Sequence, residues 1–473
     1  MKDTILKDVI LKNLIQKIII TTVIVLTISS CSVAPKKGVQ EQAIKGAVQT
    51  PDAWATTVAK NADQHKTPAK WLESFNDPLL LKLIAEGKAN NLDLQAAAGN
   101  MDKAWLLAKQ SGAALKPTAN LSLGTTQSGT ANSGSSSGQA NVGLQASWEL
   151  DVWGRLRAGV DAAHASAQAA DADYTFAQHS LAANIAKTYF KVIEAKQQAD
   201  ITQKNLSILT ETMRITQVKY DNGISSAQDV ALNRANLASA KEQLITIEGS
   251  QRNATRALEV LLGRYPNAAL EIPNVLPSLP AQPPAGVPSQ ILERRPDIVS
   301  AERQIARAFN ATTQAKAARL PSFKLTADVG GTSSSLSDIL SPSNVVWKLA
   351  GNLLAPLFDG GKRKIDVKIA NVEQKQAIAN YANSALAAFS EVENNLDEGS
   401  VLANREVALN EVLKQSNKAY HIASLNYKEG EIGLLDTLQI QQQAISAESN
   451  LLSIKRSQLE QRINLYLALG GSW

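Results

Sequence analysis

The feature that most constrains the fold of this chain is an internal repeat, because the second half of the sequence follows the pattern of the first half. A tyrosine, a glycine and an aspartate recur together 207 positions further along, as Tyr220, Gly223 and Asp229 and again as Tyr427, Gly430 and Asp436. Two alanines and a proline recur with a spacing of 204, as Ala113, Ala114 and Pro117 and again as Ala317, Ala318 and Pro321. Matches at two fixed spacings indicate one structural unit that is used twice.

The repeat sets the predicted domain boundaries. We expect residues 71–265 to form the first structural repeat and residues 289–473 the second, with residues 266–288 as a connector between them. The connector is rich in proline, which cannot occupy the interior of a helix, so it is predicted to be extended. Within each repeat the pattern predicts a helix, two strands joined by a loop, a very long helix, a turn and a further helix.

The longest predicted helices fall at equivalent places in the two copies. Residues 154–219 and 361–426 are segments of 66 residues without proline. One continuous helix of that length would extend about 100 Å, and two stacked helices would satisfy the same pattern. Aromatic residues make up only 5% of the chain, so helices that pack on one another are expected rather than a globular core.

The N-terminus has the features of a cleaved export signal followed by a lipid attachment site. Lysines up to Lys17 precede an apolar stretch over residues 18–28, which is shorter than the roughly 20 residues that a membrane-spanning helix needs. Cys31 is the only cysteine of the chain, and Ile28 to Cys31 resemble the lipobox of bacterial lipoproteins. We expect a lipoprotein signal peptide over residues 1–30 and a segment over residues 31–70 that lipid on Cys31 anchors to the outer membrane.

Four segments alternate apolar and polar residues, as strands with two different faces do. In residues 141–153, Leu144 and Trp148 alternate with Gln145 and Glu149, and the other segments lie in residues 119–123, 323–329 and 345–353. A half-buried sheet in a water-soluble protein shows the same alternation, but the glycine- and serine-rich loops and the export signal favour a transmembrane barrel. Four strands leave open edges that lipid does not tolerate, so three copies and about twelve strands are expected.

Several motifs are informative in combination. They are the stretch from Trp71 to Leu80, the run WELDVWGRLR from Trp148, ERRPDI from Glu293, PLFDGG from Pro356 and both Tyr-x-x-Gly turns. Together they resemble the TolC-like outer-membrane efflux factor family, in particular its lipoprotein branch, which serves resistance-nodulation-division pumps. The resemblance implies a mixed α and β membrane protein, a homotrimer in which a twelve-strand β-barrel is continued by a twelve-helix periplasmic α-barrel.

The resemblance also implies a function and partners. Members of the family are outer-membrane channels of tripartite efflux pumps that export small toxic molecules, and they work with a periplasmic adaptor protein and an inner-membrane pump. An outlet for type I protein secretion is the alternative within the family, although the lipobox and the proline-rich connector favour efflux. The expected location is therefore the outer membrane, with a part that extends into the periplasm.

By position, the resemblance places the adaptor contacts at two turns of the chain. Tyr220 and Gly223 belong to the first turn, and Tyr427 and Gly430 belong to the second. Glycine permits the positive φ that a tight turn at a helix end needs. Both turns are therefore predicted to lie at the periplasmic tip of the channel.

The pore constriction is expected just after the second turn, at Leu435 and Asp436 with Gln439 one helical turn further on. Three copies of Asp436 around an axis would form a ring that attracts cations, although an aspartate near a helix start also has an ordinary stabilising role. Some relatives have an arginine where this chain has Ile432, so the sequence does not decide whether salt bridges or a ring of leucines hold the gate. A link between Asp229 and Tyr427 is a further candidate.

Other functional classes have no support in the sequence. No P-loop, G-x-S-x-G or H-E-x-x-H motif occurs, so no enzyme activity is predicted. The 4 histidines are scattered and have no metal-ligand spacing, so no metal or cofactor besides the lipid on Cys31 is expected. The mild net charge of +5 argues against nucleic acid as a partner. A peripheral coiled-coil protein would account for the helices but not for the alternating strands.

Overall fold

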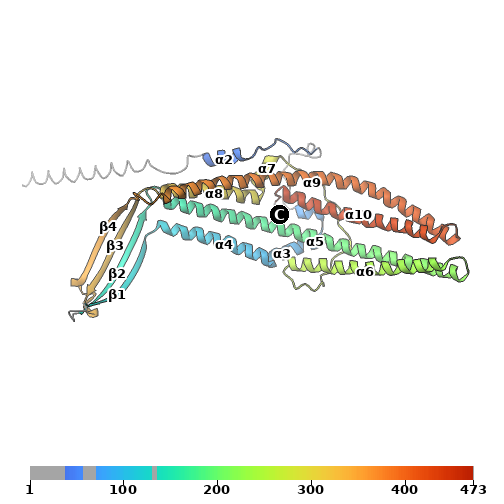
Figure 1. Ribbon diagram of the computed structural model, residues 1–473, viewed down its shortest axis with the longest axis horizontal. Coiled ribbons are helices and arrows are strands. Elements are labelled where there is room, and N and C mark those ends of the chain that lie inside the picture. Colours follow the sequence, from blue (N-terminus) through green and yellow to red (C-terminus); the bar gives the residue numbers. More distant parts are fainter. Residues whose placement is uncertain (1–37, 57–70, 130–135, 472–473) are drawn as a thin grey trace, which may run out of the picture. The chain divides into compact units, whose positions relative to one another are not determined.

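The computed structural model describes residues 38–56, 71–129 and 136–471 (Figure 1). The predicted signal peptide and the predicted lipidation site Cys31 lie outside these residues. The chain divides into two compact units. The first consists of residues up to Ala47 with residues 101–171 and 300–382, and the second consists of residues 48–100, 172–299 and 383–473.

The first unit contains a four-stranded antiparallel sheet in the order β1-β2-β3-β4. The strands are β1 (Thr118–Gly129), β2 (Ser136–Leu150), β3 (Ser322–Ser333) and β4 (Val345–Leu354). Two short 3-10 helices, η4 (Leu336–Asp338) and η5 (Pro342–Asn344), lie between β3 and β4. Each half of the chain supplies one hairpin, and the hairpins join through β2 and β3. Each of the four alternating segments thus contributes to one strand.

Four helices precede or follow the strands in the sequence. They are α4 (Leu92–Gly112), α5 (Arg155–Asp221), α8 (Pro296–Ala317) and α9 (Lys362–Glu429), and the 3-10 helix η3 (Ala113–Leu115) follows α4. α5 and α9 contain 67 and 68 residues without a break, so each proline-free segment forms one continuous helix rather than two stacked ones. Among the described residues, none of the helices combines the length and the apolar character that a membrane crossing requires.

The second unit contains the remaining long helices. α6 (Ala227–Leu261) and α10 (Leu434–Ala468) have 35 residues each and follow α5 and α9 after short turns. The shorter elements are η2 (Trp71–Phe75), α3 (Pro78–Asn90) and α7 (Pro288–Arg294). Between α6 and α7, residues 266–287 contain neither helix nor strand, which agrees with their proline content.

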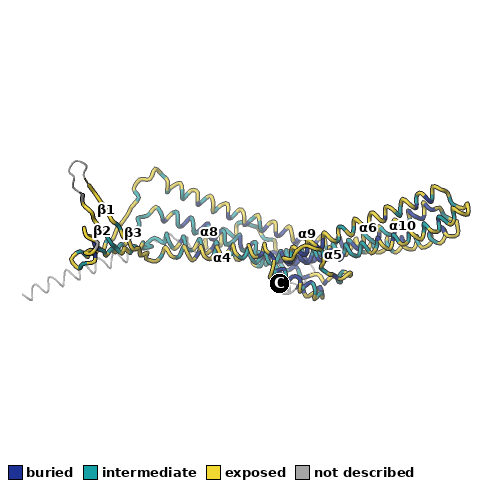
Figure 2. The backbone as a smooth tube through the Cα atoms, turned by 90° about the horizontal axis from the view of Figure 1, so that it is seen from below, coloured by how far each residue is buried: buried dark blue, intermediate teal, exposed yellow. Residues whose placement is uncertain are grey.

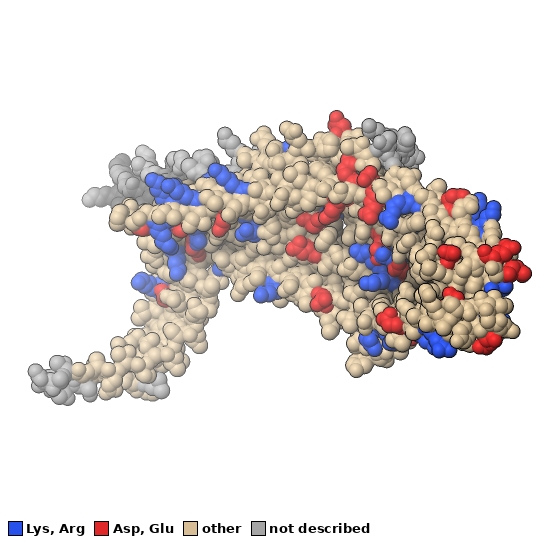
Figure 3. All heavy atoms as spheres, turned by 45° about the vertical axis from the view of Figure 1, so that its right-hand side comes forward, with Lys and Arg blue, Asp and Glu red and all other residues tan. Residues whose placement is uncertain are grey.

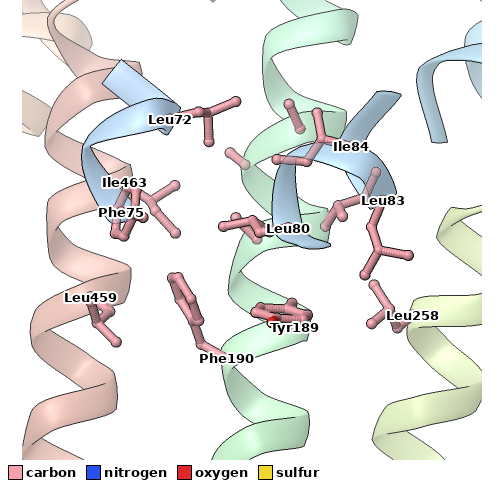
Figure 4. Close-up of a cluster of buried hydrophobic side chains, with 14 of the residues drawn as sticks. Leu72, Phe75, Leu80, Leu83, Ile84, Tyr189, Phe190, Leu258, Leu459 and Ile463 are labelled. Carbon is pink, nitrogen blue, oxygen red and sulfur yellow. The ribbon is translucent and has the colours of Figure 1, made fainter. Parts of the chain in front are cut away.

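The main hydrophobic core of the second unit forms where η2 and α3 pack against α5, α6 and α10 (Figure 4). Phe75, Tyr189 and Ile463 are almost completely buried in it. Trp71 stacks on Tyr466 with 4.4 Å between the ring centroids. Figure 2 shows that buried residues are concentrated near the C-terminal end of α10, whereas most of β1 is exposed. Aromatic side chains are few in this chain, and several of them are gathered in this one core.

Part of the predicted N-terminal segment is attached to the second unit. After α2 (Val39–Ala47), Trp54 is buried, and its indole N–H donates to the carbonyl oxygens of Ala285 and Gly286 at 3.2 and 3.1 Å. The Glu393 carboxylate on α9 accepts a hydrogen bond of 2.6 Å from the backbone N–H of Ala55. These bonds hold the segment against both the connector and α9.

Candidate functional site: strand faces and helix-hairpin ends

One face of the sheet is apolar and uncovered in the single chain. The strand register places Leu121, Leu144, Val329 and Trp347 in one row across the four strands. Their exposed fractions are 76%, 48%, 43% and 77%, respectively. Apolar surface in water is unfavourable by about 25 cal/mol per Å², and contiguous exposed apolar patches mark contacts with a membrane or another protein. This face of the sheet is therefore a contact surface.

The opposite face of the sheet is polar. Asn120, Gln145, Asp328 and Lys348 form the row next to the apolar one, with their side chains on the other side of the sheet. On the side of the molecule that Figure 3 presents, the strands carry few charged side chains. The sheet thus separates an apolar surface from a polar one that is suited to water.

Both edges of the sheet are free in the described chain. β1 pairs only with β2, and β4 pairs only with β3. A free edge leaves a row of backbone N–H and C=O groups without hydrogen bonds. Such an edge would be costly in lipid, where no water can replace the missing partners.

The first Tyr-x-x-Gly turn closes the end of α5 with a regular helix-ending motif. Gly223 has a φ of +73°, its N–H donates to the carbonyl oxygen of Tyr220 at 2.9 Å, and the N–H of Ile224 donates to that of Lys219 at 2.8 Å. These two bonds satisfy carbonyl groups at the helix end. A Cβ on Gly223 would meet no atom within 4 Å, so the backbone conformation rather than space requires glycine here.

The first turn also starts α6 with a capping box. The side chain of Ser226 accepts from the N–H of Asp229 at 3.1 Å, and the Asp229 carboxylate accepts from the N–H of Ser226 at 3.0 Å. Hydrogen bonds from Ser226 and from the Ser225 hydroxyl lower the pKa of Asp229 below its usual range. The Asp229 carboxylate is thus occupied with the start of its own helix.

The second turn ends α9 in the same way but starts α10 differently. Gly430 has a φ of +89°, and the N–H of Glu431 donates to the carbonyl oxygen of Asn426 at 2.9 Å. The N-cap of α10 is Gly433, which has no side chain to form a capping bond. Asp436 occupies the first turn of α10, and no hydrogen bond links its carboxylate to any other residue within the described part of the chain.

The structure places the three predicted constriction residues on one exposed stripe of α10. Leu435, Asp436 and Gln439 are all exposed, and their spacing puts them on one side of the helix. Leu434 and Leu438 lie on the other side, where they are buried in a cluster with Leu209 and Tyr427. A groove of about 250 Å³ runs beside the stripe, lined by Leu435, Gln439 and several amide side chains of α5, α6 and α10.

The two tyrosines of the turns differ in environment. Tyr220 is 44% exposed and Tyr427 is 6% exposed. The Tyr427 hydroxyl shares a hydrogen bond of 2.7 Å with the Thr216 hydroxyl on α5, which also accepts from the Asn233 amide at 3.1 Å. The Lys219 ammonium lies 4.4 Å from the centroid of the Tyr427 ring and donates to the Tyr427 carbonyl oxygen. Burial raises the pKa of Tyr427, and the nearby Asp229 charge adds to this effect.

In the described residues no hydrogen bond joins Asp229 to Tyr427, and the Tyr427 hydroxyl bonds to Thr216 instead. The bonds from Ser225 and Ser226 all reach Oδ2 of the Asp229 carboxylate, and the Asp229 charge acts on Tyr427 through space. Sequence reasoning missed Thr216, Lys219 and Asn233. Their only sequence signal is that polar residues occur on helix faces that also carry buried leucines, and this does not identify a partner in the other half of the chain.

Known proteins with similar sequences are outer-membrane efflux components. The pyoverdine export outer membrane protein OpmQ of Pseudomonas aeruginosa is 28% identical over 458 residues, which cover 94% of this chain and 96% of the relative. The cation efflux system protein CusC of Escherichia coli is 28% identical over 417 residues, which cover 87% and 90%. The structure of the open state of the MtrE outer membrane channel of Neisseria gonorrhoeae superposes with a TM-score of 0.77 and 29% identity, over 90% of this chain and 96% of that chain.

The sheet, the long helices and these likenesses define an outer-membrane channel protein of mixed α and β structure. The family described as outer membrane efflux protein matches residues 83–264 and 287–471, one match in each half of the chain. The chain belongs to this family. The predicted family, the outer-membrane location and the efflux function are thereby confirmed.

Proposed function

We propose that three copies of this chain form the outer-membrane channel of a tripartite efflux pump. Their sheets close into a twelve-strand barrel whose apolar rows face lipid and whose polar rows line a water-filled lumen. The long helices of the three copies continue this channel as a twelve-helix tunnel in the periplasm. The observation that carries the proposal is the sheet itself, which has one exposed apolar face and two free edges.

Duplication of an ancestral unit accounts for the architecture. The order helix, helix, strand, strand, long helix, helix occurs twice along the chain. β1 and β3 differ by the same spacing of 204 as the sequence matches, and α6 and α10 differ by 207. In the trimer the repeat would generate six similar units around the axis, which suits a closed barrel and a closed ring of helices.

The partners and the cargo follow from the class of assembly. A periplasmic adaptor would dock on the exposed turns at Gly223 and Gly430, and an inner-membrane pump would supply energy and select the cargo. We propose small toxic molecules as the cargo class, since relatives are named for the efflux of antibiotics, of toluene and of cations. The proposal includes no catalytic reaction, no metal, no cofactor and no nucleic acid.

Lipid on Cys31 would attach the N-terminus to the outer membrane after removal of residues 1–30. Each buried CH₂ of an acyl chain contributes about 0.8 kcal/mol to membrane attachment, so several chains on one cysteine hold it firmly. The contacts of Trp54 and Glu393 would then fix the other end of the segment to the body of the channel.

The resting gate would be the exposed stripe of α10. Three copies of Leu435, Asp436 and Gln439 would approach the axis, the leucines narrowing the pore and the carboxylates favouring cations. The cluster of Tyr427 with Thr216 and Lys219 would hold the second helix hairpin against the first in this state.

Native mass spectrometry of the full-length protein, purified from outer membranes in detergent, tests the proposal. A trimer is expected, with each copy carrying an acylated N-terminal cysteine. A folded monomer that is stable in the membrane would contradict the barrel, because the two sheet edges would then have no partners.

A further inference from the structure

We infer that a band of basic side chains at the helix-side end of the sheet binds the headgroups of anionic phospholipids. The basic band consists of six residues, Lys116, Lys316, Arg319, Lys362, Lys364 and Lys368. The inference rests on the proposed barrel and adds to it a preference for one class of lipid in the leaflet on the helix side. The position of the band, its charge and the apolar surface beside it support this assignment.

The topology brings the whole basic band to one end of the sheet (Figure 1). The chain passes from α4 and η3 into β1, from β2 into α5, from α8 into β3 and from β4 into α9 at this end. The hairpin connections lie at the opposite end. The strands contain between 10 and 15 residues, and about 9–11 residues are enough to cross the apolar part of a bilayer. In the proposed barrel the basic band would therefore lie at the level of the lipid headgroups.

The four junctions between the sheet and the helices hold an excess of positive charge. Residues 113–117, 149–157, 316–321 and 355–368 contain nine Lys and Arg against four Asp and Glu. This balance of +5 equals the net charge of the entire chain, so the remaining residues are neutral as a whole. Figure 3 shows Lys and Arg side chains gathered beside this end of the strands.

Ion pairs within the chain use most carboxylates of the junctions without neutralising the basic band. Three carboxylates each pair with a nearby arginine, Glu149 with Arg155 at 2.7 Å, Asp151 with Arg157 at 3.1 Å and Asp359 with Arg363 at 3.2 Å. The six side chains of the basic band are exposed, and none of them forms an ion pair with another described residue. They outnumber Asp366, the remaining carboxylate of the junctions, by six to one. Such a group of cations attracts an anionic surface.

Helix stability does not account for the cations at the start of α9. The first turn of α9 contains Lys362 and Lys364 and no acidic residue, although the positive end of the helix dipole disfavours cations there. Lys364 and Lys368 are four residues apart, a spacing at which like charges on a helix repel each other. The dipole thus accounts for Lys316 in the last turn of α8 but not for the lysines of α9. An anion from outside the chain would offset both unfavourable effects.

The apolar surface beside the basic band favours a lipid over a free phosphate ion. Leu357 and Phe358 shortly precede Lys362 and are 95% and 93% exposed. Trp148 lies opposite an apolar residue of β3 near the same end of the sheet, and its indole N–H donates to the carbonyl oxygen of Leu115 at 3.0 Å. Tryptophan is enriched at membrane–water interfaces because its ring is apolar and its N–H is polar. A ligand that joins acyl chains to a phosphate contacts both kinds of surface at once.

Native mass spectrometry of the full-length trimer with added lipid tests the inference. The two probes are phosphatidylglycerol and phosphatidylcholine with the same acyl chains, which differ in the net charge of the headgroup. The band variant combines three substitutions, Lys362→Gln, Lys364→Gln and Lys368→Gln. A charge-preserving variant has arginine substitutions at the same positions, Lys362→Arg, Lys364→Arg and Lys368→Arg. The matched control removes three exposed lysines outside the basic band, Lys82→Gln, Lys241→Gln and Lys418→Gln.

We expect the wild type, the control and the charge-preserving variant to bind phosphatidylglycerol about fivefold or more tightly than phosphatidylcholine, and the band variant to lose this preference. In the wild type the preference should also weaken as the salt concentration rises, because salt screens exposed charges. This second measurement tests the inference without any variant.

Equal binding of the two lipids by the wild type, a preference that salt does not change, or an unchanged preference in the band variant would overturn the inference while the trimer remains. Displacement of the lipid by glycerol phosphate at the same concentration would overturn the assignment to a lipid in favour of a free phosphate. Monomers of the wild type in the same spectra would instead contradict the proposed function itself.

Discussion

At the scale of single residues, Asp229 and Asp436 occupy equivalent positions in the two copies but have different surroundings. The Asp229 carboxylate is engaged by Ser225 and Ser226, and the corresponding cap position before Asp436 is Gly433. A serine cap uses the carboxylate for helix stability, whereas a glycine cap leaves it available. The Asp436 carboxylate therefore lacks the capping bonds that the Asp229 carboxylate makes.

We expect Asp436→Asn to lower the cation preference of the channel in planar-bilayer recordings, because it removes three charges from the proposed constriction. Asp229→Asn is the matched control. It should leave ion preference unchanged and weaken the start of α6 by about 1 kcal/mol, seen as faster hydrogen exchange there. An equal loss of cation preference in both variants would show that the overall negative charge of the channel, rather than the exposed stripe of α10, selects ions.

A second residue-scale prediction concerns Thr216. Thr216→Val keeps the side-chain shape but leaves the buried Tyr427 hydroxyl and the Asn233 amide without their shared partner, at a cost of about 1–3 kcal/mol per group. We expect a larger mean conductance and greater sensitivity of cells to vancomycin, since the second hairpin is held less firmly. Thr210→Val is the control, because Thr210 is exposed and its hydroxyl bonds only within α5. Wild-type conductance in the Thr216 variant would show that Tyr427 does not help to hold the gate closed.

At the scale of elements, the sequence predicts the features that neighbouring residues determine, and it does not predict those that depend on contacts between distant residues. The proline-free runs gave α5 and α9, and period-two alternation gave all four strands, because helix continuity and strand faces are set by neighbouring residues. Tertiary contacts decide which tyrosine is buried. The sequence patterns around Tyr220 and Tyr427 are therefore the same, although only Tyr427 forms a hydrogen bond with Thr216. The short α7 and the docking of Trp54 were missed for the same reason.

The helix-ending turns allow a prediction that separates backbone from surface. Gly430→Val forces a β-branched residue into a positive φ, which costs roughly 1–2 kcal/mol, whereas Gly430→Asn is tolerated better there. We expect the valine variant to lose most efflux, measured as drug tolerance, while trimers still assemble, and the asparagine variant to lose less. Gly223→Val should behave like Gly430→Val. Unchanged tolerance in both valine variants would contradict adaptor docking at these turns.

At the scale of the whole molecule, the free sheet edges and the apolar face indicate that one chain is only a part of the functional object. β1 and β4 are the outermost strands and are exposed along almost their whole length. The helical core around Trp71 and Tyr466, by contrast, is already complete in one copy. We therefore expect the helices of one chain to fold without a partner. We expect the sheet to gain hydrogen-bond partners for its two outer strands only when copies assemble.

The two faces of the sheet give a prediction for the assembled molecule, because adjacent residues of β1 point to opposite sides. Leu121→Lys places a charge on the apolar face, which costs about 2–4 kcal/mol near the middle of a bilayer, so we expect less trimer in the outer membrane. Asn120→Lys places the same charge on the polar face and should preserve the amount of trimer while reducing cation conductance through the barrel. Trimer content on native gels and planar-bilayer recordings measure the two effects. If Asn120→Lys prevents assembly and Leu121→Lys does not, the apolar rows do not face lipid and the proposed barrel is inverted.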